Sequence, residues 1–126
     1  SPAPQAVSGA YKAKLGRELR GEMRSLLTFA EREVLPYPHQ DERQNRDAAW
    51  YFKERTERIS AGLGLMALFA DAETLRQGSE ALQQFEVLWT MASEDESAER
   101  RREQQERITR AIDRFDLLLK RELAGK

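Results

Sequence analysis

Chemistry-bearing residues are sparse in this chain of 126 residues, which contains one histidine and no cysteine. Without cysteine there is no thiolate nucleophile, disulfide, zinc–thiolate site or iron–sulfur site. His39 lies close to Tyr37, Asp41 and Glu42. A selective zinc site needs further nitrogen or thiolate ligands, so we expect a solvated loop histidine rather than a metal ligand or a pH-dependent switch. No metal or other cofactor is expected.

Carboxylates that are close in the sequence favour ion pairing over catalysis. Glu31 and Glu33, like Asp113 and Asp116, have arginine within one helical turn. The Glu-x-x-His pairs of di-iron bundles do not occur. The segment 62–64 resembles a phosphate loop only in its two glycines, because it lacks a third glycine and a preceding strand. The sequence therefore gives no positive sign of an enzyme.

Arginine shows the clearest pattern, as two stripes that each lie beside the apolar face of a predicted helix. The stripe members are Arg17, Arg20 and Arg24 in the first helix and Arg107, Arg110, Arg114 and Arg121 in the last. If the two stripes were adjacent, they would form a docking surface for phosphate, acidic protein or anionic lipid. Otherwise they pair with acids of a neighbouring helix or face water.

Arg55 is a separate candidate for anion contact, because it lies near the apolar stripe of Phe52 and Ile59. An unpaired buried charge costs several kcal/mol, about the desolvation penalty of one ion. Arg55 must therefore pair with a carboxylate, reach solvent along its aliphatic stem or meet an anionic ligand.

An apolar excess on the second predicted helix indicates an interaction surface. Its predicted members are Trp50, Tyr51, Leu65, Leu68 and Phe69. The third helix is short and the last one is polar through its first ten residues, so the Trp50 end has thin cover. Aromatic residues are enriched at protein interfaces. We expect this surface to meet another copy or a helix of a protein partner.

Strong helix formers dominate the chain, and no sustained alternation indicates a strand. This predicts an all-α fold, an antiparallel four-helix bundle, or a less regular orthogonal bundle if the segment 71–78 kinks. The predicted elements are helices over 8–34 and 41–70, a short helical turn over 71–78, a third helix capped by Ser79, and a last helix over 98–123. Residues 1–9 are predicted to form a flexible linker, and residues 10–124 a single domain.

The patterning also predicts how these helices pack. In the second helix the core stripe is Ala48, Phe52, Ile59, Leu63 and Met66. Its second half is apolar nearly all round, so we expect it to be the central, enclosed helix. The last helix has a core stripe only from Ile108 onward, and we expect its start to project or fray. At that start Arg102–Glu106, Glu103–Arg107 and Glu106–Arg110 have the spacing of ion pairs along a helix.

The charge balance limits the classes of partner. Lys and Arg number 21 against 22 Asp and Glu, a net charge of −1, which argues against a nucleic-acid partner. The longest uncharged run, 59–70, is too short to span a bilayer. We expect a non-enzymatic interaction or regulatory domain that binds a protein partner or itself through helix faces. The alternatives are a small-anion or small-ligand sensor bundle and a nucleic-acid or anionic-surface adaptor that uses the arginine stripes. The compartment stays open, with the cytoplasm slightly favoured over the periplasm.

Overall fold

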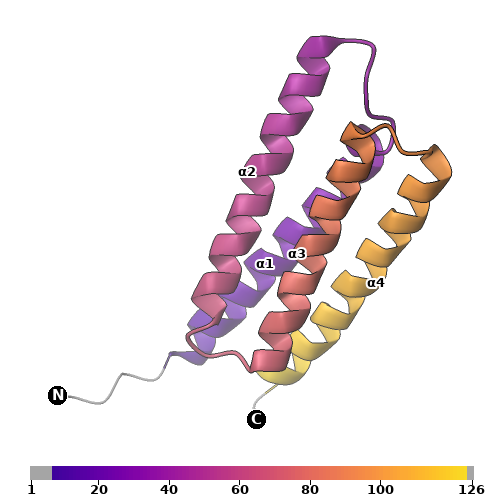
Figure 1. Ribbon diagram of the computed structural model, residues 1–126. Coiled ribbons are helices and arrows are strands. Elements are labelled where there is room, and N and C mark those ends of the chain that lie inside the picture. Colours follow the sequence, from indigo (N-terminus) through magenta and orange to yellow (C-terminus); the bar gives the residue numbers. More distant parts are fainter. Residues whose placement is uncertain (1–6, 125–126) are drawn as a thin grey trace.

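Four long helices form the molecule in the computed structural model, which describes residues 7–124 (Figure 1). Helix α1 (Gly9–Phe29) continues into a π-helical turn, η1 (Ala30–Val34), and is followed by α2 (Glu42–Met66), α3 (Ala72–Ser93) and α4 (Ala98–Leu123). Successive helices run antiparallel, with α2 and α4 at diagonally opposite corners. The predicted all-α four-helix bundle is confirmed. Most of the predicted linker, 1–9, lies outside the described residues, and α1 already begins at Gly9.

Polar residues fix the start of each helix. Ser8, Asp41 and Ser97 precede α1, α2 and α4, and each side chain accepts a backbone N–H of the first turn, at 3.1, 2.8 and 3.2 Å. Such caps satisfy donors that have no partner within the helix. Asp71 holds the same position before α3, and its backbone N–H donates to Glu122 Oε1 at 2.6 Å. This bond ties the start of α3 to the end of α4.

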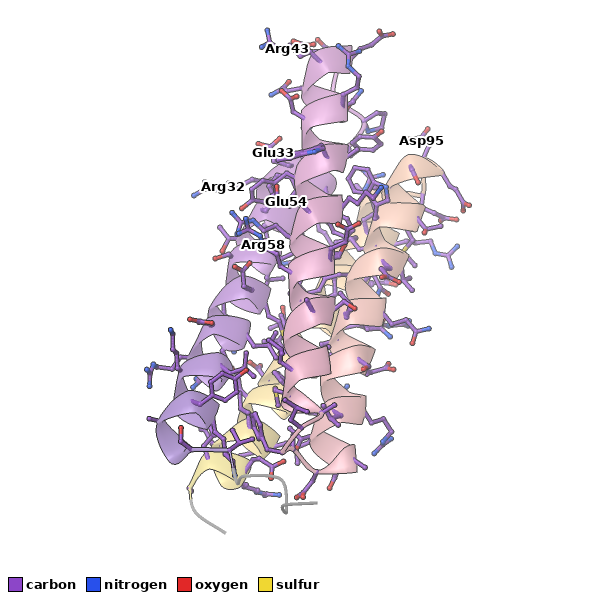
Figure 2. The ribbon with its side chains drawn as sticks, turned by 90° about the vertical axis from the view of Figure 1, so that its left-hand side faces the viewer. Arg32, Glu33, Arg43, Glu54, Arg58 and Asp95 are labelled. Atoms are coloured by element: carbon purple, nitrogen blue, oxygen red, sulfur yellow. The ribbon has the colours of Figure 1, made fainter. Side chains whose placement is uncertain are left out.

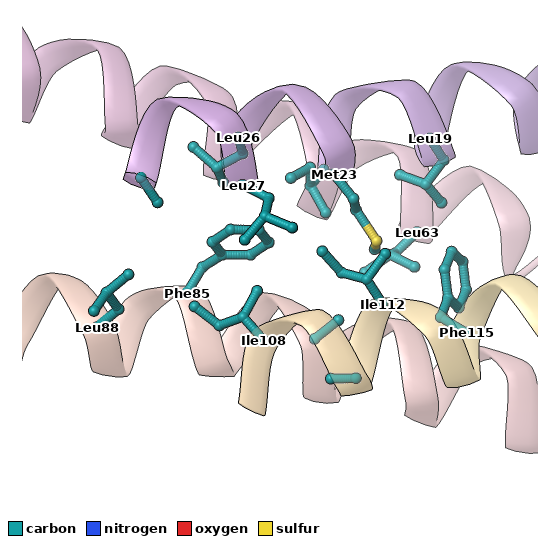
Figure 3. Packing of buried hydrophobic residues seen from close by; sticks show 14 of the residues in the cluster. Leu19, Met23, Leu26, Leu27, Leu63, Phe85, Leu88, Ile108, Ile112 and Phe115 are labelled. Atoms are coloured by element: carbon teal, nitrogen blue, oxygen red, sulfur yellow. The ribbon is translucent and has the colours of Figure 1, made fainter. Parts of the chain in front are cut away.

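The core lies where the apolar stripes of the four helices meet (Figure 3). The predicted stripe of α2 is buried along its whole length, from Ala48 to Met66. Side chains from α1, α3 and α4 close over it. The largest fully buried apolar residues are Met23, Leu26, Ile59, Met66, Phe85, Leu88, Ile108, Ile112, Phe115 and Leu119. Among the described residues no helix is both long and apolar enough to cross a membrane.

Helix α2 is not the enclosed central helix that its sequence predicts. It lies at a corner of the bundle and packs on α1 and α3, whereas the closest pairing is between α3 and α4. Leu65 is 47% exposed and Leu68 69% exposed. The helix also ends at Met66 rather than at residue 70. The apolar residues outside the core stripe are therefore left on the surface.

The separate helical turn predicted over 71–78 is also wrong, because α3 is a single helix that runs through Gly78. A Cβ at this glycine would lie 2.5 Å from Leu63 Cδ2 and 2.9 Å from Phe115 Cε1. The glycine marks a place where side chains of α2 and α4 pack directly on the backbone of α3, not a helix end. Ser79 is inside the helix and caps nothing.

The start of α4 is anchored, contrary to the expectation that it projects or frays. Arg101 and Gln104 are buried there. Arg101 Nε donates to the carbonyl of Leu35 at 2.9 Å, and its guanidinium also donates to the carbonyl of Glu96. Gln104 Nε2 donates to the carbonyl and to Oε1 of Gln84, at 2.9 and 2.7 Å. Polar side chains thus hold this segment where apolar ones are absent.

Truncating Leu63 should test the core directly. Leu63 is 7% exposed, so Leu63→Ala should lower the free energy of unfolding by about 2–5 kcal/mol, measured by chemical denaturation. Leu117 is an exposed leucine of α4, and Leu117→Ala should change stability by less than about 0.5 kcal/mol. Equal losses in the two variants would contradict this core.

Two glycine substitutions should change the stability of the fold in opposite directions. Gly78→Ala forces a Cβ into Leu63 and Phe115 and should destabilise the fold by about 1–3 kcal/mol, as overpacking does. No atom of the described residues outside the helix's own turn lies within 4 Å of a Cβ at Gly64, so Gly64→Ala should stabilise α2 by up to about 1 kcal/mol. Thermal melts of both variants decide the point, and a neutral Gly78→Ala would show that α3 and its neighbours are further apart.

Candidate functional site

The solvent side of α2 carries three of the five predicted interface residues. We call this side the α2 outer face and define it by Trp50, Lys53, Glu54, Glu57, Ala61, Gly64, Leu65 and Leu68. Trp50 is 66% exposed. Trp50 and Leu65 are 15 positions apart, about 22 Å along the helix axis, and Leu68 lies in the turn just after the helix ends at Met66. The outer face thus has one apolar anchor near each end.

Tyr51 and Phe69, the other two predicted interface residues, turn toward α1. The ring centroid of Tyr51 is 4.3 Å from that of Phe29, and the guanidinium of Arg55 lies 4.8 Å from the Tyr51 ring. Phe69 lies under the ammonium of Lys12, 5.5 Å from its ring centroid. Both side chains are half-buried. They support the α1–α2 contact and do not join the outer face.

The apolar surface at the end of α2 continues into a shallow hollow between α1 and α2, with a volume of about 310 Å³. Leu65 belongs to both the hollow and the outer face. The apolar lining consists of Leu15, Leu19, Ala61, Gly62 and Leu65, and the charged rim of Glu18, Glu22 and Arg58. An inserted side chain would therefore meet aliphatic groups at the bottom and charges at the edge.

Charged residues occupy the middle of the outer face. Arg58 Nη2 lies 2.8 Å from Glu54 Oε1, and Arg58 Nη1 lies 3.8 Å from Glu22 Oε1. Figure 2, in which α2 faces the viewer, shows Glu54 and Arg58 on the side of α2 next to α1. Lys53 and Glu57 are exposed beside them. The two apolar ends are thus joined by a segment that carries both positive and negative charges.

The first turns of α2 extend beyond the other helices. Both views show the Arg43 end projecting past the ends of α1 and α3 (Figures 1 and 2). Nearly all side chains from Glu42 to Asp47 are exposed. Trp50 is exposed as expected, but not because the third helix is short, since α3 has 22 residues.

Arg55 has a carboxylate partner. Its Nη1 lies 3.1 Å from Glu22 Oε2, and both side chains are partly buried. Burial lowers the pKa of Arg55, but the hydrogen bond to Glu22 and the nearby Tyr51 and Glu54 more than compensate, so that its pKa is raised. The geometry assigns Arg55 a structural ion pair with a ring beneath it, and its charge is not left for a ligand.

The two arginine stripes do not come together. Arg20 and Arg24 lie on the side of α1 that meets α4, and Asp116 of α4 lies between them, 3.3 Å from Arg20 Nε and 2.6 Å from Arg24 Nη2. Arg24 also contacts Asp113 at 2.9 Å. Hydrogen bonds to Asp113 and Asp116 raise the pKa of Arg24. This part of the first stripe is an interhelical ion network, while Arg17 is exposed and forms no ion pair with any of residues 7–124.

Arg107, Arg110 and Arg114 lie on the other flank of α4, next to α3. They line a hollow of about 250 Å³ together with Glu80 and Gln84. Within residues 7–124 these three guanidinium groups form no hydrogen bond or ion pair. The three pairs expected along the start of α4, Arg102–Glu106, Glu103–Arg107 and Glu106–Arg110, are likewise not formed there. Arg121 is exposed further along the same flank.

His39 is not the solvated loop residue that the sequence predicts. Its side chain is 12% exposed, and its Nε2 lies 3.1 Å from Glu33 Oε2. The ring makes an edge contact with Tyr37, at 6.2 Å between centroids. Its backbone N–H donates to Asn45 Oδ1 at 2.7 Å. Together these contacts fold the α1–α2 loop onto η1.

A chain of side-chain hydrogen bonds that links α4 to α3 is not predicted from the sequence. Gln104 donates to Gln84 Oε1, and Gln84 Nε2 donates to Glu80 Oε1 at 2.8 Å. The chain runs from the interior to the arginine hollow. Nothing marks Gln104 in the sequence, because it lies in a uniformly polar stretch. Only the pairing of α3 with α4 shows that it points inward.

The described residues contain no group of three or more His, Cys, Asp or Glu side chains that could hold a metal ion. Comparison of the chain with protein families, with curated proteins and with solved structures finds no significant match. Function must therefore be argued from the two surfaces just described, the α2 outer face and the arginine hollow.

The ion network between α1 and α4 should contribute unequally through its two carboxylates. Asp116 is 12% exposed and lies against two arginines. Asp116→Asn should therefore cost about 1–3 kcal/mol of stability, because it weakens charged hydrogen bonds in a partly buried place. Asp113 is 60% exposed, and Asp113→Asn should cost less than about 1 kcal/mol. Urea unfolding of both variants measures the difference, and a larger loss at Asp113 would contradict this geometry.

Proposed function

We propose that this domain is a non-enzymatic interaction module that associates with a second copy of itself through the α2 outer face. The observation that carries the proposal is the exposure of Trp50 and Leu65 on the solvent side of α2, 66% and 47%, and of Leu68 in the turn just after this helix, 69%. Exposed tryptophan is the residue type that contributes most often to the energetic centre of an interface.

A second copy fits this face because the face is self-complementary. In a two-fold dimer each patch meets its counterpart in reverse order. If two α2 helices pack antiparallel about an axis near residues 57–58, residue 50 of one copy lies opposite residue 65 of the other. Trp50 then reaches Leu65 and the small residues Ala61 and Gly64. The two apolar ends of each helix would cover those of its partner.

The charged middle of the outer face supports the same arrangement. With the axis near residues 57–58, Glu57 of each copy lies beside Arg58 of the other. In the single chain Glu57 is exposed, whereas Arg58 is about half exposed and already contacts Glu54 and Glu22, so Glu57 of the other copy would add a third carboxylate to this cluster. Opposite charges that meet across an interface fix the register more than they add affinity. In a parallel arrangement Glu57 would lie beside Glu57 of the other copy, and Arg58 beside Arg58. Like charges would then meet across the interface.

Replacing Trp50 by glutamate tests the proposal. Trp50→Glu should leave the helical content unchanged by circular dichroism, since the side chain is outside the core. It should weaken self-association by about 2 kcal/mol or more, the usual loss for an interface hot spot. Light scattering as a function of protein concentration measures the association.

A matched control is available on α4, where Leu117 is also a large exposed apolar residue. Leu117→Glu should keep the association of the unchanged chain. An unchanged chain that is monomeric at every concentration would contradict the proposal. A Trp50→Glu variant that unfolds would show instead that Trp50 belongs to the core.

A further inference from the structure

We infer that the hollow between α3 and α4 binds a small ligand carrying neighbouring phosphoryl groups, through Arg107, Arg110 and Arg114. This site lies on α4, diagonally opposite α2, so it does not depend on the proposed self-association. Three observations support the inference: the shape of the surface, the absence of partners for its cations, and the way its one acid is held.

Shape is the first. The three guanidinium groups line a hollow of about 250 Å³ rather than a convex helix face. Arg107 and Arg114 are two turns apart, about 10 Å along the axis, with Arg110 between them. Three guanidinium groups offer many more N–H donors than the oxygens of one phosphoryl group can accept, which favours two linked phosphoryl groups over one. Guanidinium groups donate in a planar fork that matches phosphate oxygens.

The second observation is that these cations have no anion in the described part of the chain, although acids are close in sequence. Glu103 and Glu106 are each four residues before Arg107 and Arg110, yet neither pair is formed. Arginines at helix contacts, such as Arg20, Arg24 and Arg55, do contact carboxylates, whereas other exposed arginines such as Arg17 form no ion pair within the described residues. What distinguishes Arg107, Arg110 and Arg114 is that all three line one hollow. Three like charges in one hollow repel each other, so an anion bound there gains from all three.

The third observation concerns Glu80, the acid in the lining. Gln84 Nε2 donates to Glu80 Oε1 at 2.8 Å, and Gln84 Oε1 accepts from the buried Gln104 at 2.7 Å. This chain holds the Glu80 carboxylate on the α3 side, where it forms no ion pair with the arginines. Its negative charge nevertheless opposes a bound phosphate. The site therefore predicts that removing this charge strengthens binding.

Titration with pyrophosphate, followed by backbone and guanidinium ¹⁵N NMR at constant ionic strength, tests the inference. Saturable shifts should centre on residues 107–114 and 80–84. Arg110→Gln should weaken binding about tenfold or more, the effect of one charged hydrogen bond. Glu80→Gln should tighten it. Arg17 is an exposed arginine of α1, and Arg17→Gln should leave binding unchanged.

Three results would overturn the inference. The first is the absence of saturable shifts with pyrophosphate. The second is equal weakening by Arg17→Gln and Arg110→Gln, which would mean a diffuse charge effect. The third is tighter binding of a short single-stranded DNA with a steep salt dependence, which would make this flank a nucleic-acid surface instead.

Discussion

The contact of Leu63 and Phe115 with the backbone of α3 at Gly78 is the constraint on which the rest of the structure depends. Only a glycine leaves room there, since an added Cβ would lie 2.5 Å from Leu63. The contact brings α2, α3 and α4 together at one level of the bundle. It also sets which side of α2 is inward, because Leu63 belongs to the stripe of Phe52, Ile59 and Met66.

Both candidate surfaces follow from this contact. Turning the Leu63 side of α2 inward leaves Trp50, Leu65 and Leu68 outside. The close pairing of α3 with α4 lets Gln104 reach Gln84 in the interior, and Glu80 is then held at the edge of the arginine hollow. The apolar surface and the basic surface thus lie at opposite corners, on α2 and α4. A single molecule could use both at the same time.

Much of the fold can be predicted from the sequence because apolar periodicity and capping residues are local signals. Ser8, Asp41 and Ser97 mark three helix starts, and the stripe of α2 is buried as its spacing indicates. The prediction fails at Gly78, since a glycine that ends a helix and one that admits a neighbour look alike in a sequence. It fails again at Arg101 and Gln104, whose burial depends on partners in distant segments.

The candidate sites are less predictable because they depend on how helices pair. Periodicity placed Arg20 and Arg107 in equivalent stripes, yet one contacts Asp116 and the other contacts no acid within the described residues. Tyr51 and Trp50 are neighbours in the sequence, but Tyr51 packs on Phe29 while Trp50 faces solvent. Sequence identifies the residue types, and only the relative rotation of the helices decides which remain exposed.

The central claim, that two copies meet antiparallel along α2, can be tested by measuring one distance between copies. The chain has no cysteine, so Ser60→Cys, at an exposed position of α2, provides a single site for a spin label close to the expected two-fold axis without removing Glu57 or Arg58. Packed helices have axes about 8–10 Å apart. Pulsed electron spin resonance should therefore show a short distance between copies for this label and a much longer one for a label at Arg102 on α4. A long distance or no dipolar coupling at position 60, in a sample that light scattering shows to be dimeric, would contradict the account.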